Sequence, residues 1–376
     1  GSLGFDFYKN YVEGAKEYNE EITKATTEKR EPKLTEVKGY KALDDTTFQV
    51  KLTKPFAPFI YYMCQGFSYI VPKEAVEKYG KDFFQNPVGT GPFVFKSWTP
   101  DLEIIMDKNP AYWDKDQHGN QIPYLSGIKF RFIKDLSQQL LEFKNGNLYE
   151  SYRIPNELFK TIVNEDKTLT PEYSNFVVQR KTSLSTQYYG FLVTSKVFSD
   201  VKVRQAFNYA IDREKILKYV LQGSATDPAI YGMVPPVMPN YNAKNVKGYT
   251  FDLAKAKQLM SDAGFPGGKG FPEVTLNINE GGGRNTQIAE AIQDMLKEIG
   301  VTVKLQLLQF AQHLDNIDAG RSDFYRLGWN ADYPDPETFL NLFYGKNVPS
   351  NPKDVSPINS FRYKNPEYDA LFEKAI

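Results

Sequence analysis

Cysteine and histidine are the scarcest side chains in this sequence that could carry chemistry. The 376 residues include one cysteine, Cys64, and two histidines, His118 and His313. A single cysteine cannot form an internal disulfide, and so few soft ligands exclude a structural zinc site. The sequence therefore predicts no metal site and no cofactor.

The surroundings of these side chains do not indicate catalysis. Cys64 lies in YYMCQGF, and we expect it to be a small buried hydrophobe because free cysteines are usually buried. His118 lies in the turn-rich polar stretch DKDQHGNQ, where we expect a solvated side chain. Neither residue enters the predicted site.

Net charge and long apolar runs are also lacking. Lys and Arg together number 46, as do Asp and Glu, so the formal net charge is zero. Without an overall positive field, nucleic acid is not an expected partner. No apolar run approaches the roughly 20 residues of a membrane-spanning helix, and the first residues show no charged and then apolar signal pattern.

What the sequence does have is length and aromatic surface. A chain of 376 residues with 41% hydrophobic and 24% charged residues has the composition of a globular protein of two or three domains. Aromatic residues make up 15% of the chain, with 25 Tyr, 27 Phe and 3 Trp. Most of these rings are expected in cores, but tyrosine also lines binding surfaces because its apolar ring carries a polar tip.

Strands and helices alternate along the chain, most regularly in its second half. Alternation of apolar and polar residues predicts strands at 47–52, 93–98, 102–113, 127–133, 188–193, 272–279, 301–308 and 324–329. Helical spacing predicts helices at 73–80, 137–146, 201–211, 213–221, 253–264 and 286–300. Aspartates suited to the N-cap precede three of these helices, at Asp200, Asp212 and Asp252. This order predicts an α/β lobe with at least partly parallel strands.

One motif stands out directly after the strand at 324–329. The stretch GWNADYPDPETFL contains three acids, and two of them fit a helix start. Asp335 is suited to the N-cap, Pro336 to the first helical position and Glu337 to the acid-favouring first turn. No capping role is apparent for the third acid, Asp332.

The position of Asp332 favours a binding site. In open α/β sheets, ligands lie beyond the carboxyl ends of strands, and Asp332 follows such an end. A buried carboxylate beside Trp329 and Tyr333 suits an amino group, which gains an ion pair and attraction to a ring face. The strand at 324–329 also offers an extended backbone with which an extended ligand could pair, whatever its side chains. These features together predict capture of peptides.

The sequence is also compatible with two other kinds of site. Asp332, Asp335 and Glu337 could supply the carboxylate pair of a glycosidase, although Asp335 already has a role as a cap. The run EGGGRN at 280–285 precedes a helix and resembles a phosphate cradle, but it lacks the Gly-Lys-Ser/Thr signature of a nucleotide loop. It could be a flexible turn, or a carboxylate site with Arg284 as the charged donor.

Several motifs together resemble the extracytoplasmic solute-binding proteins that deliver oligopeptides and related ligands to ABC importers, known as bacterial solute-binding protein family 5. In chain order they are PVGTGPFVFKSW, MDKNPAYW, FSDVKVRQAFNYAIDREKIL, TFDLAKAKQLMSDAGFPGG, RLGWNADYPDPETFLNLFY and FRYKNPEYDALFEKA. The resemblance covers nearly the whole chain. It implies a two-lobed, periplasmic-binding-protein-like α/β fold of type II, cluster C, with an extra small lobe, that closes on its ligand without covalent chemistry.

The resemblance also implies roles for residues of the motif. Asp332 matches the acid that receives the α-ammonium group of a peptide, and Gly328, Trp329 and Asn330 match the strand that pairs with the ligand main chain. For Trp329, core packing is the alternative role. Tyr333 and Arg284 are expected in the site from the residue patterns described above. The full set of expected ligand-binding residues is Asp332, Trp329, Gly328, Asn330, Arg326, Tyr333 and Arg284.

Arg326 matches a position that can meet ligand carboxylates in the family. The alternative for this side chain is a salt bridge to a neighbouring acid such as Asp323. Some members use a further arginine upstream, where this chain has Ile317. The sequence therefore lacks one of the arginines with which some members anchor the C-terminal carboxylate of a ligand.

Compared with the family pattern, this sequence is expected to be truncated at both ends, which leaves the first lobe incomplete. The resemblance assigns residues 1–88 to the small second lobe, 89–186 to the first lobe and 187–376 to a third lobe with the ligand motif. It implies a monomer in the periplasm or at the outer face of the cytoplasmic membrane, where a lipid anchor is possible in the family.

The expected partners are a peptide or other small solute and the membrane subunits of an ABC importer. Relatives also carry sugars, nickel complexes, haem or murein peptides, and the sequence does not rank these ligands. The scarcity of histidine and cysteine argues only against a soft metal ligated directly by the protein.

Overall fold

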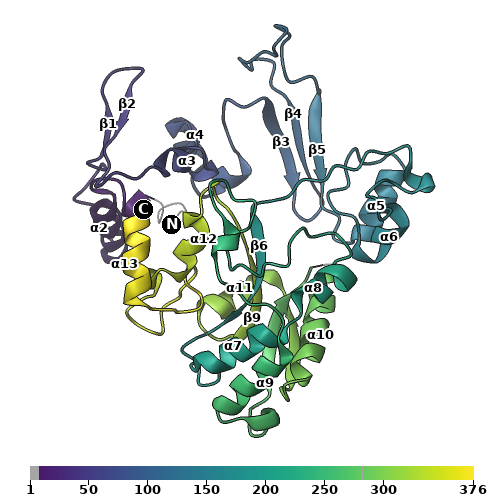
Figure 1. The fold of residues 1–376 in the computed structure, drawn as a ribbon. Coiled ribbons are helices and arrows are strands. Elements are labelled where there is room, and N and C mark those ends of the chain that lie inside the picture. Colours follow the sequence, from purple (N-terminus) through teal and green to yellow (C-terminus); the bar gives the residue numbers. More distant parts are fainter. Residues whose placement is uncertain (1–7, 282) are drawn as a thin grey trace. The chain divides into compact units, whose positions relative to one another are not determined.

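The computed structural model describes residues 8–281 and 283–376. The chain divides into two compact units, Gly1–Ile133 and Lys134–Ile376. Figure 1 shows the elements of each unit along the chain. The division into three lobes at residues 88 and 186 stays a prediction, and residues 1–7 of its small second lobe lie outside the described residues.

The first unit combines short helices with two small antiparallel sheets. Its helices are α2 (Ala15–Glu28), α3 (Phe59–Met63) and α4 (Lys73–Tyr79). Strands β1 (Tyr40–Ala42) and β2 (Phe48–Val50) form a hairpin, and β3 (Phe93–Thr99), β4 (Glu103–Lys108) and β5 (Gly127–Arg131) form a three-stranded sheet in that order. In the hairpin turn, Asp44 Oδ1 accepts a bond from the backbone N–H of Thr46 at 2.8 Å, as expected for an aspartate at the start of a turn.

The second unit is built on a four-stranded mixed sheet with the order β6-β9-β7-β8. The strands are β6 (Ser185–Phe191), β7 (Val274–Asn279), β8 (Val303–Leu308) and β9 (Phe324–Asn330). Strand β7 runs parallel to both β8 and β9, whereas β6 is antiparallel to β9. The prediction of at least partly parallel pairing is therefore confirmed.

Three helices of the second unit, α7, α8 and α9, begin where the sequence predicts. Asp200, Asp212 and Asp252 accept bonds from the backbone N–H groups of Lys202, Lys215 and Lys255. Each bond satisfies one of the N–H groups that lack a partner in the first turn of a helix. The helices are α5 (Leu136–Lys144), α6 (Phe159–Ile162), α7 (Val201–Ala210), α8 (Arg213–Lys215), α9 (Leu253–Asp262), α10 (Arg284–Lys297), α11 (Phe310–Asp318), α12 (Glu337–Leu340) and α13 (Pro366–Ala375).

Both faces of this sheet are covered, and β9 contributes to each. Phe324 lies in a core cluster with residues of α7, α9 and α10, which gather beside the sheet in Figure 1. The next residue, Tyr325, packs on the other face with Ile317 of α11, because successive side chains of a strand point to opposite faces. Residues of α5 and α6 form a separate small core with Tyr173.

The expectation that Cys64 is buried is wrong. Its side chain is exposed, because Cys64 follows the short helix α3, whose one buried residue among those described is Tyr62. The thiol donates to the carbonyl oxygen of Ile60 at 3.5 Å. His118 is exposed, as predicted.

Replacing Phe324 by alanine is expected to lower the free energy of unfolding by about 3–5 kcal/mol, because the change leaves a cavity between β9 and three helices. Phe310→Ala is the matched control, since the Phe310 side chain is 53% exposed and should cost less than about 1 kcal/mol. Urea unfolding followed by circular dichroism measures both. Equal losses for the two variants would contradict this assignment of the core.

Candidate functional site

The parallel pairing of β7 and β9 brings two of the predicted sites to one edge of the sheet. Parallel neighbours end on the same side, so the segments that follow Asn279 and Asn330 both leave from that edge. Arg284 begins the helix after β7, and Asp332 lies in the loop after β9. We treat this edge as the candidate site.

At its carboxyl end, strand β9 is paired on one side only, with β6. The carbonyl of Asp323 accepts from Leu192, and the N–H of Ala331 donates to Leu184, so odd-numbered residues of β9 face β6 with their peptide groups. Because peptide groups alternate along a strand, those of Gly328 and Asn330 face the other way. The pairing of β9 with β7 ends at Tyr325 in the described residues, which leaves Gly328 and Asn330 beyond it.

His313 marks the point where β7 and β9 part. The side chain is buried, and its Nε2 donates to the carbonyl oxygen of Arg326 at 2.7 Å. Burial lowers the pKa of His313, and this bond raises it in part. His313 therefore occupies the carbonyl oxygen of Arg326, and the peptide groups of Gly328 and Asn330 lie beyond this point in β9.

Asp332 presents its carboxylate to solvent beside a buried hydroxyl. The expectation of a buried carboxylate is wrong, because Asp332 is exposed in the loop after β9. Thr338 donates its hydroxyl proton to Asp332 Oδ2 at 3.1 Å. Nearby protein atoms raise the pKa of Asp332 by desolvation, whereas the bond from Thr338 lowers it. An accessible carboxylate in a partly dehydrated setting suits a cationic ligand group, because the ion pair is screened less than in bulk water.

Trp329 and Tyr333 are more enclosed than Asp332. Trp329 packs against two core clusters, and its indole N–H donates to Thr338 Oγ1 at 3.1 Å. Tyr333 is only 5% exposed, and its hydroxyl donates to Glu337 Oε2. Core packing is thus one role of both rings, and contact of either ring with a ligand stays a prediction.

Glu337 is the buried acid of the motif, which the sequence did not indicate. Helix α12 begins at Glu337, one residue later than predicted, and Asp335 Oδ1 accepts from its backbone N–H at 2.8 Å. The side chain of Glu337 is 6% exposed. Burial raises its pKa to about 7, while the bond from Tyr333 opposes the rise. Glu337 therefore faces the interior of the loop, which does not favour the carboxylate pair of a glycosidase.

Arg326 is held by neutral side chains. Its Nη1 donates to Asn279 Oδ1 at 2.9 Å, and its Nη2 donates to Gln187 Oε1. Among the described residues, Arg326 does not form the alternative salt bridge to Asp323. Burial lowers the pKa of Arg326, so the guanidinium lies in a partly dehydrated place, and among the described residues it forms no ion pair with an acid.

Arg284 lies near Arg326 and adds to the same positive field. It begins α10, and Asn285 ties that start to the end of β7 by donating to the carbonyl of Asn279 at 3.0 Å. Burial lowers the pKa of Arg284, and the charge of Arg153 lowers it further. Arg153 was not singled out from the sequence. Of the predicted run EGGGRN, Gly282 lies outside the described residues.

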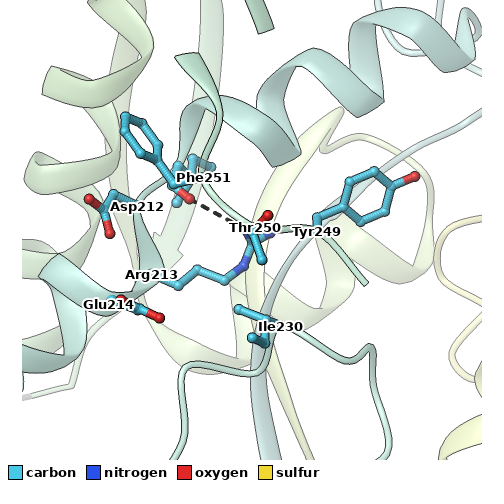
Figure 2. A pocket seen from close by; sticks show the side chains of 8 residues that line it. Asp212, Arg213, Glu214, Ile230, Tyr249, Thr250 and Phe251 are labelled. Atoms are coloured by element: carbon cyan, nitrogen blue, oxygen red, sulfur yellow. Dashed lines mark hydrogen bonds between the residues drawn. The ribbon is translucent and has the colours of Figure 1, made fainter. Parts of the chain in front are cut away.

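A pocket of about 240 Å³ elsewhere in this unit has a structural explanation. It is lined by Ile211, Asp212, Arg213, Glu214, Ile230, Tyr249, Thr250 and Phe251. Figure 2 shows the Arg213 side chain reaching toward Thr250. This guanidinium donates to Asn208 O at 3.0 Å and to Ile211 O at 3.4 Å. It therefore satisfies carbonyl groups at the end of α7, and none of the motif residues lines this pocket.

The fold is that of the periplasmic binding proteins, as its likeness to solved structures of that class shows. Residues 12–351 match the family described as bacterial extracellular solute-binding proteins, family 5 Middle. The chain belongs to this family. The fold class and family expected from the sequence are therefore confirmed. Within the described residues, no helix has the length and apolarity needed to cross a membrane.

The relatives include binding proteins for several peptides. The glutathione-binding protein GsiB of Shigella flexneri serotype 5b is 28% identical over 342 residues, which cover 89% of this chain and 62% of that protein. The solved structure of DppA from Helicobacter pylori with the peptide STSA has 29% identity, a TM-score of 0.76 and coverage of 90% of this chain and 62% of that one.

The murein tripeptide binding protein MppA of Escherichia coli has 26% identity and a TM-score of 0.72, with 90% and 62% of the two chains covered. The present chain thus spans less than two thirds of the length of these relatives. By their names they are binding proteins rather than enzymes.

We expect Glu337 to make the protein less stable as pH rises from about 4.5 to about 7. The folded state holds the Glu337 proton up to a pKa of about 7, whereas the ordinary value is 4.5. Between these values the unfolded chain has released a proton that the folded chain keeps, so unfolding becomes easier by roughly 3 kcal/mol across the window.

Urea unfolding at several pH values between 4 and 8 measures this effect in the wild type and in Glu337→Gln. Glutamine still accepts the bond from Tyr333 but cannot titrate, so the variant should lose most of the decline in stability over this window. Parallel stability profiles for the two proteins would show that Glu337 does not titrate as described.

Proposed function

We propose that this protein is the substrate-binding component of an ABC importer and that it captures peptides. The observation that carries the proposal is the exposed carboxylate of Asp332, which directly follows a strand whose last peptide groups extend beyond their neighbour β7. In this proposal, Asp332 receives the α-ammonium group of the ligand. The binding step involves no covalent chemistry.

The ligand main chain pairs with Gly328 and Asn330. Their peptide groups face away from β6, so an extended ligand can add itself as a strand on that side. Hydrogen bonds of this kind do not depend on the ligand's side chains, which would let one site accept many sequences. Trp329 contributes a partly buried ring next to the ammonium position, where ring-face attraction adds to the ion pair.

The ligand carboxylate is assigned to Arg326 and Arg284. Both side chains are half-buried, and the polar partners of Arg326 are the neutral side chains of Asn279 and Gln187. An arginine can bind a carboxylate through two parallel bonds. A peptide brings one ammonium and at least one carboxylate group, so its charges complement those of the site, whereas a neutral sugar brings neither.

The relatives' ligands support peptides over the other solutes. Three relatives are described with glutathione, the peptide STSA and a murein tripeptide as their ligands. Against a metal ligated directly by the protein, the described residues contain no cluster of three or more histidine, cysteine or acidic side chains that could hold a metal ion. A murein peptide remains a second candidate, because MppA is similar over 90% of this chain.

We further propose the cellular setting that the family implies. The protein would act as a monomer in the periplasm or at the outer face of the cytoplasmic membrane, with or without a lipid anchor. It would hand its ligand to the membrane subunits of the importer. The description of the family as extracellular and of the relatives as periplasmic supports this setting.

Asp332→Asn is expected to remove the preference for a free amino group. The wild type should bind a tripeptide such as Ala-Ala-Ala about 10 to 100 times more tightly than its N-acetylated form, since a bond to a charged group is worth roughly 1.5–3 kcal/mol. Isothermal titration calorimetry of both peptides measures this ratio. Asp335→Asn is the control, because Asp335 belongs to the same loop but caps α12. A wild type that binds both peptides equally would remove the role of Asp332.

Arg284→Gln and Arg326→Gln are expected to weaken binding of the free acid and to leave binding of the C-terminally amidated peptide nearly unchanged. Each loss should be about tenfold, because one charge-assisted bond is removed. Arg321→Gln is the matched control, since Arg321 bonds Asn316 and Asp315 at the end of α11. If both variants keep the wild-type ratio between acid and amide, the carboxylate binds elsewhere.

A further inference from the structure

The hydroxyl group of Thr338 joins three parts of the ligand motif. It accepts the indole N–H of Trp329 at 3.1 Å and the backbone N–H of Asp332 at 3.3 Å, and it donates to Asp332 Oδ2 at 3.1 Å. A hydroxyl group can donate once and accept twice. These three bonds therefore use its full capacity, and a side chain that is 3% exposed has little access to water as a substitute.

Thr338 belongs to an element that is itself held in place. It lies in α12, whose first N–H bonds Asp335 and whose Glu337 bonds Tyr333. At the other end of α12, the Tyr368 hydroxyl donates to the carbonyl of Leu340 at 2.7 Å. The hydroxyl group of Thr338 therefore lies on a helix held at both ends, and its bonds to Asp332 position the loop after β9.

We propose that Thr338 is a positioning residue that orients the carboxylate of Asp332 and the indole of Trp329 for the same ligand ammonium group. The inference rests on the function proposed above. The bond to Oδ2 limits rotation of the carboxylate, and the bond from the indole N–H limits rotation of the ring. Both groups form hydrogen bonds with the same oxygen atom, Thr338 Oγ1. Their relative placement is therefore set before a ligand arrives, and such preorganisation favours binding.

The same bond also favours the charged form of the anchor. Desolvation raises the pKa of Asp332, and the hydrogen bond from Thr338 is the contribution that lowers it. Removal of the hydroxyl group should therefore have two effects in the same direction: a less fixed carboxylate and a higher Asp332 pKa. Both effects weaken attraction to an ammonium group and have little influence on a ligand whose amine is acetylated.

Thr186 provides a matched control for the loss of a buried threonine hydroxyl. It is 7% exposed, it lies in β6 opposite Trp329 in the ladder, and its hydroxyl donates to Met233 O at 2.8 Å. Thr186→Val thus removes a buried bond close to the motif without touching Asp332. A purely structural role for Thr338 would make the two valine variants behave alike.

The test compares the affinities of Ala-Ala-Ala and N-acetyl-Ala-Ala-Ala by calorimetry in the wild type, Thr338→Val, Thr338→Ser and Thr186→Val. We expect Thr338→Val to lose about tenfold in affinity for the free amine and less than about threefold for the acetylated peptide. The serine variant keeps the hydroxyl group and should keep the preference, as should Thr186→Val. Thr338→Ala takes the place of the valine variant if circular dichroism shows that the latter is unfolded.

The outcomes separate this inference from the proposed function. A wild type without preference for the free amine overturns the amine anchor and the role of Thr338 together. A wild-type preference that persists in Thr338→Val or Thr338→Ala overturns the role of Thr338 alone. As a second readout, carbon NMR should find a higher Asp332 pKa in the variant without the hydroxyl group, and an unchanged pKa would also count against the inference.

Discussion

The position of β9 inside the mixed sheet is the constraint on which the candidate site depends. Antiparallel β6 pairs with the strand along its length, whereas parallel β7 pairs only with Phe324 and Tyr325 at its start. The buried rings of these two residues pack on opposite faces of the sheet. The peptide groups of Gly328 and Asn330 therefore extend beyond β7, while β6 holds this part of the strand in register. In the proposed function, an extended ligand pairs with these peptide groups.

The charges of the site are separated by the same geometry. Arg326 points to the face where α10 begins, and Asp332 follows the strand end, so opposite charges lie at different points of one edge rather than neutralising each other. Burial of Arg326 is tolerated because Asn279 and Gln187 accept its N–H groups. We propose a zwitterionic, extended ligand for this arrangement, because the two ends of a peptide carry the charges opposite to those of Asp332 and the arginines.

Local features of this protein followed closely from the sequence. The N-cap aspartates Asp200, Asp212 and Asp252 accept the bonds predicted for them, since capping involves residues only a few positions apart. The prediction that Cys64 is buried was wrong, because the exposure of this residue depends on how a short helix packs and not on its own apolar character. The burial of Glu337 was missed for a similar reason: a first-turn acid has the same local signature whether it faces water or, as here, the hydroxyl of Tyr333.

The sequence by itself determined the family, the alternation of strands and helices, and the placement of Asp332 just after a strand, because these depend on periodicity and on neighbours along the chain. Only the tertiary structure decided that β9 is flanked by β6 and β7, that Gln187 and Asn279 hold Arg326, and that Thr338 joins Trp329 to Asp332. Contacts between β6, β7 and β9 bring together residues far apart in sequence, and the direction of a side chain from α12 depends on packing that no local pattern encodes.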